Sequence, residues 1–131
     1  MKRTYTCPHC HGVLNPGTKI VLRGERAGKT ALILLSPKPG NYDAVVPEGF
    51  PLKEKDKVDF FCPLCRKNLV APREPSMARL AFHYGSFLGF VAFSRVYGKH
   101  STYVITEESV KSYGEHATPE AVNFFGVGPE D

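Results

Sequence analysis

The chain has 131 residues, of which 42% are hydrophobic, and its formal net charge is +4. This length is typical of one domain with its own core, so we treat residues 1–131 as a single domain. Lysine and arginine are spread along the chain with acidic residues between them, which differs from the dense basic stripe of a dedicated nucleic-acid-binding protein. No apolar signal segment follows Met1, and the longest apolar stretch, 80–93, is shorter than the roughly 20 residues that span a bilayer. We therefore expect a soluble, cytoplasmic protein without a membrane segment.

Alternating or continuous apolar runs predict several strands in the first half of the chain, residues 1–72. Residues 19–22 and 30–35 are apolar runs joined by a turn that glycines bracket, a pattern that predicts a β-hairpin. Segment 36–51 is rich in proline and glycine and is expected to be a loop without regular structure. Residues 58–61 predict a strand that leads into a second pair of cysteines.

The second half, residues 73–131, predicts a three-stranded antiparallel meander at 77–84, 88–96 and 101–106, because β-branched and aromatic residues dominate these runs. Two short helices are expected after it. Thr106 would cap the first, over 107–113, and Thr118-Pro119 would begin the second. The expected fold class is therefore α+β and β-rich, with short C-terminal helices.

The most specific pattern is a repeated Cys-Pro-x-Cys motif, which occurs at residues 7–10 and again at residues 62–65. A turn of this spacing aims two sulfur atoms at one point, and two such turns supply the tetrahedral four-thiolate site that Zn²⁺ favours. The predicted metal ligands are Cys7, Cys10, Cys62 and Cys65. Thiols stay reduced in the cytoplasm, which favours a metal over disulfides.

The two halves of this motif share further features: β-like residues precede each one, and a leucine, Leu14 or Leu69, follows four residues after its second cysteine. Over residues 4–15 and 58–70 the chain resembles the zinc-ribbon family, in which two cysteine knuckles at hairpin tips clasp one metal. The resemblance implies a structural Zn(Cys)₄ site. Because the knuckles are far apart in the sequence, it also implies a β-rich insertion between them.

Other chemistries fit parts of the same motif. Residues 7–11 match the C-x-x-C-H pattern of covalent haem attachment, but the second cysteine pair would then have no role. A thiol redox motif sits at a helix N-terminus, and the residues that follow Cys10 cannot sustain a helix. Iron could occupy four thiolates as it does in a rubredoxin-like electron carrier. Zinc is the expected metal, with iron as the alternative.

Basic and imidazole side chains flank the cysteines, namely His9, His11, Arg66 and Lys67. They are candidates for contact with a partner or with nucleic-acid phosphates, and their simpler interpretation is exposed knuckle residues that offset the charge of the site. Residues 24–30 end in Gly-Lys-Thr but lack the first glycine of a phosphate-binding loop. The polar cluster at 97–103 imposes no catalytic spacing.

The sequence thus favours a small non-catalytic zinc protein that acts as a macromolecular interaction module, with a protein partner preferred over nucleic acid. The alternatives are a nucleic-acid-binding or regulatory zinc-ribbon protein and a rubredoxin-like or thiol redox protein. A closed four-thiolate site leaves no coordination position for water, and this argues against an enzyme. Nothing in the sequence predicts the oligomeric state.

Overall fold

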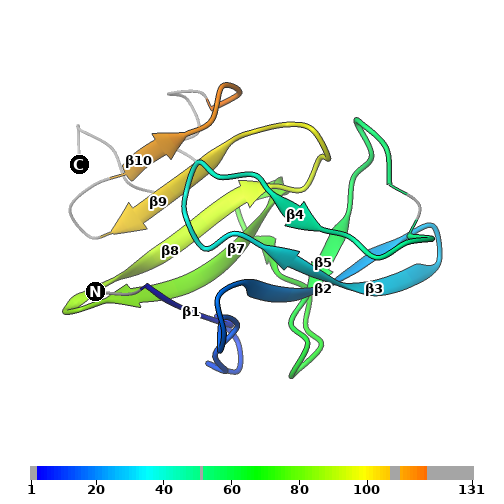
Figure 1. Ribbon diagram of the computed structural model, residues 1–131. Helices are drawn as coiled ribbons and strands as arrows, with labels where there is room; N and C mark the ends of the chain where they lie inside the picture. The colour runs from blue at the N-terminus through cyan, green and yellow to red at the C-terminus, as the bar shows by residue number, and fades with distance from the viewer. Residues whose placement is uncertain (1–2, 51, 107–109, 118–131) are drawn as a thin grey trace.

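The fold, seen in a computed structural model that describes residues 3–50, 52–106 and 110–117, consists of two antiparallel β-sheets (Figure 1). The first sheet has the strand order β1-β7-β8-β9-β10, and β6 also pairs with β7. The second sheet has the order β4-β3-β2-β5. The strand bounds are β1 Thr4–Thr6, β2 Ile20–Arg26, β3 Lys29–Leu35, β4 Ala44–Val45, β5 Asp59–Phe61, β6 Val70–Ala71, β7 Glu74–Tyr84, β8 Phe87–Ser94, β9 Thr102–Thr106 and β10 Val110–Tyr113.

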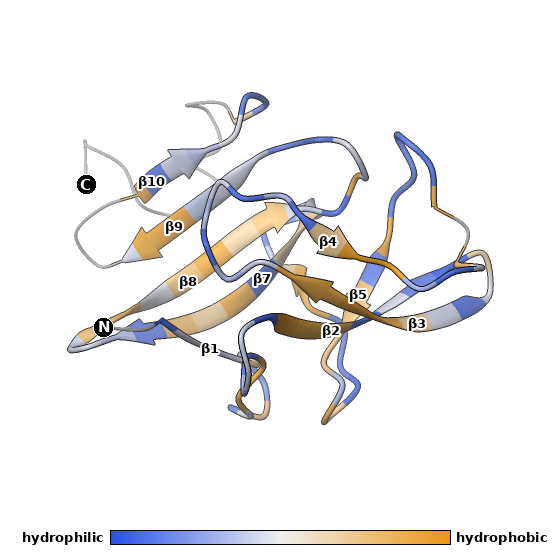
Figure 2. Ribbon diagram, in the orientation of Figure 1, coloured by the Kyte–Doolittle hydropathy of each residue, from blue (hydrophilic) through white to orange (hydrophobic). Residues whose placement is uncertain are grey.

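The two sheets pack against each other through one apolar core. Leu22 and Ile33 come from the second sheet, and Leu80, Val91 and Val104 come from the first, and all five are buried in the same cluster. Each strand alternates between this core and its other face, as side chains with a period of two must. Figure 2 shows the apolar residues concentrated along β2, β3, β7, β8 and β9, where the sheets meet.

A second, smaller cluster lies on the opposite face of the first sheet. Met77, Ala92, Tyr103 and Ile105 are buried there, and the partly buried Val110 packs against them. This cluster explains why the residues after β9 form a strand. Val110 pairs with Ile105, so β10 covers the cluster while it satisfies the backbone of the β9 edge.

The expected C-terminal helices are wrong for the residues that the structure describes, which contain no helix. Val110–Tyr113, placed in a helix by the sequence, is strand β10. Four residues with a β-branched and an aromatic side chain gain more from pairing with a long neighbouring strand than from one isolated helical turn. The second expected helix, from Thr118, lies outside the described residues.

The β-rich character and the antiparallel meander are confirmed, with β7, β8 and β9 as consecutive neighbours. The 30–35 and 19–22 runs form the expected hairpin, but both strands continue to a tight turn in which Ala27 and Gly28 have φ of 54° and 77°. The 36–51 segment is not wholly irregular, because Ala44–Val45 adds a short edge strand beside β3. Among the described residues, no helix is long and apolar enough to cross a membrane.

Candidate metal centre

The first cysteine knuckle is a closed backbone loop that follows β1. The Cys7 amide donates to the Gly12 carbonyl at 3.0 Å, and the His11 amide donates to the Cys7 carbonyl at 2.9 Å. Inside this loop the amides of His9 and Cys10 donate to the Cys7 sulfur at 3.3 Å and 3.4 Å. Such N–H donors stabilise a thiolate, so this turn suits a metal ligand.

The second knuckle repeats this geometry bond for bond after β5. The Cys62 amide donates to the Lys67 carbonyl at 3.0 Å, and the Arg66 amide donates to the Cys62 carbonyl at 2.9 Å. The amides of Leu64 and Cys65 donate to the Cys62 sulfur at 3.3 Å and 3.4 Å. The likeness between the two motifs in the sequence is therefore a likeness in structure.

The residue after the second cysteine of each knuckle adopts a left-handed backbone conformation, with φ of 65° at both His11 and Arg66. Gly12, the next residue of the first knuckle, is required for space and not for a left-handed conformation. A Cβ on Gly12 would lie 2.3 Å from the Leu64 side chain of the other knuckle. Gly12 therefore provides the space in which Leu64 lies beside the first knuckle and close to the sulfur cluster.

The four sulfur atoms converge on one point. Sγ of Cys7 lies 3.7 Å from Sγ of Cys65, and Sγ of Cys10 lies 3.7 Å from Sγ of Cys62. All four lie within 4.8 Å of one another. A metal–sulfur distance of about 2.3 Å gives a regular tetrahedron with edges of about 3.8 Å. The sulfurs are thus placed to hold one metal ion, and their separations are far longer than the bond of about 2 Å in a disulfide.

Both knuckles lie where the chain passes from one sheet to the other (Figure 1). The first connects β1 of the first sheet to β2 of the second, and the second connects β5 of the second sheet to β6 of the first. One further backbone hydrogen bond joins the two ends of each knuckle. The Leu14 amide donates to the Tyr5 carbonyl in the first, and the Leu69 amide donates to the Phe60 carbonyl in the second, each at 2.8 Å. A metal in this site would join the two crossings.

The four thiols differ in their surroundings. Cys7 and Cys62 are fully buried, whereas Cys10 is exposed and Cys65 is half-buried. Burial raises the pKa of the Cys7 thiol to about 12, and it also raises the pKa of Cys62. The Lys67 amide, which donates to the Cys65 sulfur, lowers the pKa of Cys65 to about 7. Without a metal, the two buried sulfurs are therefore neutral thiols at pH 7.

The flanking candidates lie around the cluster but not in it. His9, His11, Arg66 and Lys67 are all exposed, and the metal-binding group found among the described residues contains the four cysteines alone. The His9 Nε2 atom lies 3.3 Å from the Asn68 carbonyl oxygen, which links the first knuckle to the second. All four are therefore exposed residues of the two knuckles that flank the sulfur cluster.

Sequence reasoning missed one structural residue of this region. Asn15 is buried, accepts a hydrogen bond from the Tyr5 amide at 2.8 Å and donates to the Arg3 carbonyl at 2.9 Å. It fixes β1 to the end of the first knuckle. Its place in a turn-like Asn-Pro-Gly sequence concealed this role, because such residues are usually exposed.

Comparison with protein-family models, with curated protein sequences and with solved structures finds no match to this chain. The assignment of a four-cysteine metal site, compatible with a zinc-ribbon-like segment, therefore rests on the geometry of the knuckles and on the clustered sulfurs.

Proposed function

We propose that this chain is a non-catalytic zinc protein in which a Zn(Cys)₄ site fixes the metal end of a β-sandwich that binds another protein. The observation that carries the zinc site is the pair of alike knuckles whose four sulfurs lie within 4.8 Å of one another, two pairs of them at 3.7 Å, close to the edge of a tetrahedral site. Four thiolates favour zinc or iron, and zinc is the commoner occupant of such structural sites. With every position filled by sulfur, no site for an activated water is left.

A protein-binding role is supported by an exposed apolar surface at the end of the β7–β8 hairpin, which we call the hairpin-tip patch. Its residues are Tyr84, Phe87, Leu88 and Phe90. Phe87 is 58% exposed and Leu88 is 68% exposed, although both are large apolar side chains. Tyr84 and Phe87 pair across the two strands, and Leu88 and Phe90 lie on the other face of the hairpin, so the patch surrounds the hairpin tip. Several exposed apolar side chains in one place mark an interaction site more often than a single one does. Burial of these side chains against a protein partner would remove apolar area from water.

The experiment compares the wild type with a Phe87→Ser, Leu88→Ser double variant. The matched control is Leu32→Ser, Val45→Ser, which changes two exposed apolar residues of the second sheet. All three proteins are used as immobilised bait in the same native lysate, and self-association is measured by sedimentation velocity. We expect the wild type and the control to retain the same proteins and the patch variant to lose them. Identical retention by all three proteins contradicts this role for the patch.

A nucleic-acid-binding function is the second candidate, and a specific surface favours it. Arg66 and Lys67 of the second knuckle and His9 and His11 of the first are exposed, so they could meet phosphates. The test is binding to a generic single-stranded oligonucleotide at low salt, with an Arg66→Ala, Lys67→Ala variant and a Lys29→Ala, Lys111→Ala control. A smaller salt dependence in the first variant alone supports this candidate, and the absence of binding at low salt eliminates it.

A further inference from the structure

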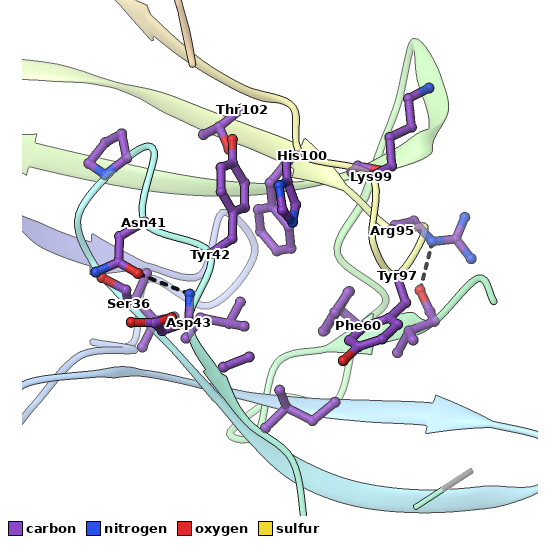
Figure 3. A pocket seen from close by; sticks show the side chains of 18 of the residues that line it. Ser36, Asn41, Tyr42, Asp43, Phe60, Arg95, Tyr97, Lys99, His100 and Thr102 are labelled. Carbon is purple, nitrogen blue, oxygen red and sulfur yellow. Dashed lines mark hydrogen bonds between the residues drawn. The ribbon is translucent and has the colours of Figure 1, made fainter. Parts of the chain in front are cut away.

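A cavity of about 310 Å³ lies between the two sheets, and none of the four cysteines lines it. One wall comes from residues 36–46, a segment that follows β3 and includes the short strand β4. Another wall comes from residues 94–100, which begin at the last residue of β8. Figure 3 shows side chains from both segments facing a common space. Its volume is at the lower end of the range of small-molecule sites, about 300–1,000 Å³.

The walls between the sheets are apolar. Ile33 and Leu35 contribute from β3, Phe60 from β5, and Val91 and Phe93 from β8. The Phe60 and Phe93 rings meet edge to face, with their centroids 5.4 Å apart. A ligand that fills this space would gain roughly 25 cal/mol for each Å² of apolar surface removed from water.

Aromatic and hydroxyl groups form the wall nearest the 36–46 segment. The Tyr42 hydroxyl lies 2.8 Å from Thr102 Oγ1 and donates to the Tyr113 carbonyl at 3.1 Å. The Tyr42 ring stacks on His100, with centroids 4.3 Å apart and an interplanar angle of 8°. Tyr97 lies on the other side of the space in Figure 3. This part of the cavity is therefore fixed by contacts within the protein before any ligand binds.

The far side of the cavity is also held by the backbone. The Val58 amide donates to the Arg95 carbonyl at 2.9 Å, and the Tyr97 amide donates to the Asp56 carbonyl at 2.7 Å. Arg95 is itself paired with Asp59 and donates through Nε to the Val58 carbonyl at 3.0 Å. The charge of Arg95 is thus already satisfied by the protein, and a ligand is not needed to neutralise it.

The charges that line the cavity do not favour an ionic ligand of either sign. The lining includes the basic Lys38 and Lys99 and the acidic Asp43 and Glu54, so it carries both signs. Among the described buried polar side-chain atoms, those without a partner belong to arginines outside the cavity. The Tyr5 hydroxyl, which does line it, donates to the Pro37 carbonyl at 2.5 Å. A charged ligand would lose hydration on burial, and its attraction to one sign of the lining would be offset by repulsion from the other.

We infer that this cavity binds a small, uncharged and mainly apolar molecule that carries a hydrogen-bonding group at one end. The apolar body would lie between the sheets, and the polar group would lie near the Tyr42 and His100 wall. None of the four cysteines and none of the hairpin-tip residues lines this site, and it adds a ligand to a protein proposed above as an interaction module.

The test uses three probes with the same ring system, namely 2-naphthol, 2-naphthoate and naphthalen-2-ylmethylammonium. Binding is measured by calorimetry, and its location by amide chemical shifts of the ¹⁵N-labelled protein. We expect 2-naphthol to bind about tenfold or more tightly than either ion, a ratio equivalent to about 1.4 kcal/mol. The shifts should concentrate in residues 36–46 and 94–102. Equal binding of the three probes, shifts elsewhere, or no binding would overturn the inference.

Two matched pairs of variants test the position of the ligand. Leu35→Trp fills the cavity from β3, whereas Leu32→Trp places the same side chain on the exposed face of that strand. In a second pair, Val46→Phe fills the cavity and Val45→Phe, at the exposed neighbouring residue, is the control. This pair replaces the first if Leu35→Trp does not fold. The filled variants should bind 2-naphthol about tenfold more weakly or worse, and the controls within about twofold of the wild type. Unchanged binding in a folded, filled variant contradicts the assignment.

Discussion

Removal of one buried cysteine should uncouple the two sheet crossings. Cys7 is fully buried, and its sulfur lies 3.7 Å from that of Cys65 on the other knuckle. A Cys7→Ser variant keeps the knuckle backbone but loses one of four soft ligands. The expected effect is the loss of most of the metal affinity, because a hydroxyl oxygen is a poor replacement for a thiolate in such a site.

The magnitude follows from linkage between binding and folding. Structural zinc contributes roughly 10–16 kcal/mol in small fingers, where the metal is almost the whole core. In this protein an apolar core also joins the sheets, so we expect the metal to contribute less to the free energy of unfolding than it does in a small finger. A metal present at about 1,000 times its dissociation constant stabilises the folded state by about 4 kcal/mol. An unfolding entropy of about 2.1 cal/mol/K per residue gives roughly 3.6 °C for each kcal/mol in a chain of 131 residues, so the melting temperature should fall by about 15 °C.

The assay is thermal unfolding of wild type and variant, each with and without a chelator. The chelated wild type should melt near the Cys7→Ser variant, and the chelator should leave the variant unchanged. Amide hydrogen exchange should show the loss of protection at the Leu14 and Leu69 amides, whose hydrogen bonds join the two ends of each knuckle. Equal melting temperatures in all four samples would refute the idea that a metal joins the two crossings.

Three further predictions concern protonation and packing. Since burial raises the pKa of Cys7 to about 12 and also raises that of Cys62, both are protonated at pH 7, and zinc binding should release about two protons or more. The affinity for zinc should therefore rise with pH. Calorimetry in buffers of different ionisation enthalpy measures the number of protons released, and a number near zero would contradict the protonation of Cys7 and Cys62. Asn15→Ala leaves a buried amide of β1 without its acceptor and should cost about 1–3 kcal/mol in urea unfolding. Gly89→Ala places a Cβ 2.1 Å from a backbone oxygen of β9 and should cost about 3 kcal/mol or more, whereas Gly17→Ala meets no atom within 4 Å and should change stability by less than about 0.5 kcal/mol.

The cysteine cluster could be predicted from the sequence because its cause is local. A Cys-Pro-x-Cys turn determines the direction of its own two sulfurs, and the repeat of the motif indicates that both turns serve one site. The β2–β3 hairpin was equally accessible, because two apolar runs and a glycine turn lie within a few residues of one another. Only the strand ends, at Arg26 and Lys29, went beyond the prediction.

Features that depend on distant contacts could not be predicted in this way. The 110–113 segment forms a strand because Val110 meets Ile105 and the second apolar cluster, neither of which a local helix signal reveals. The crossing of the first knuckle between the sheets depends on the pairing of β1 with β7, and that of the second knuckle depends on the pairing of β6 with β7. The cavity depends on the approach of the 36–46 and 94–100 segments, and each of these alone has the composition of an ordinary loop.

The central claim is that the four cysteines hold one zinc ion. The most direct measurement is elemental analysis of the purified full chain together with X-ray absorption at the metal edge. We expect one zinc per chain, bound by four sulfurs at about 2.3 Å. Iron in place of zinc, a nitrogen or oxygen ligand in the first coordination sphere, or a metal-free protein with four free thiols would contradict it.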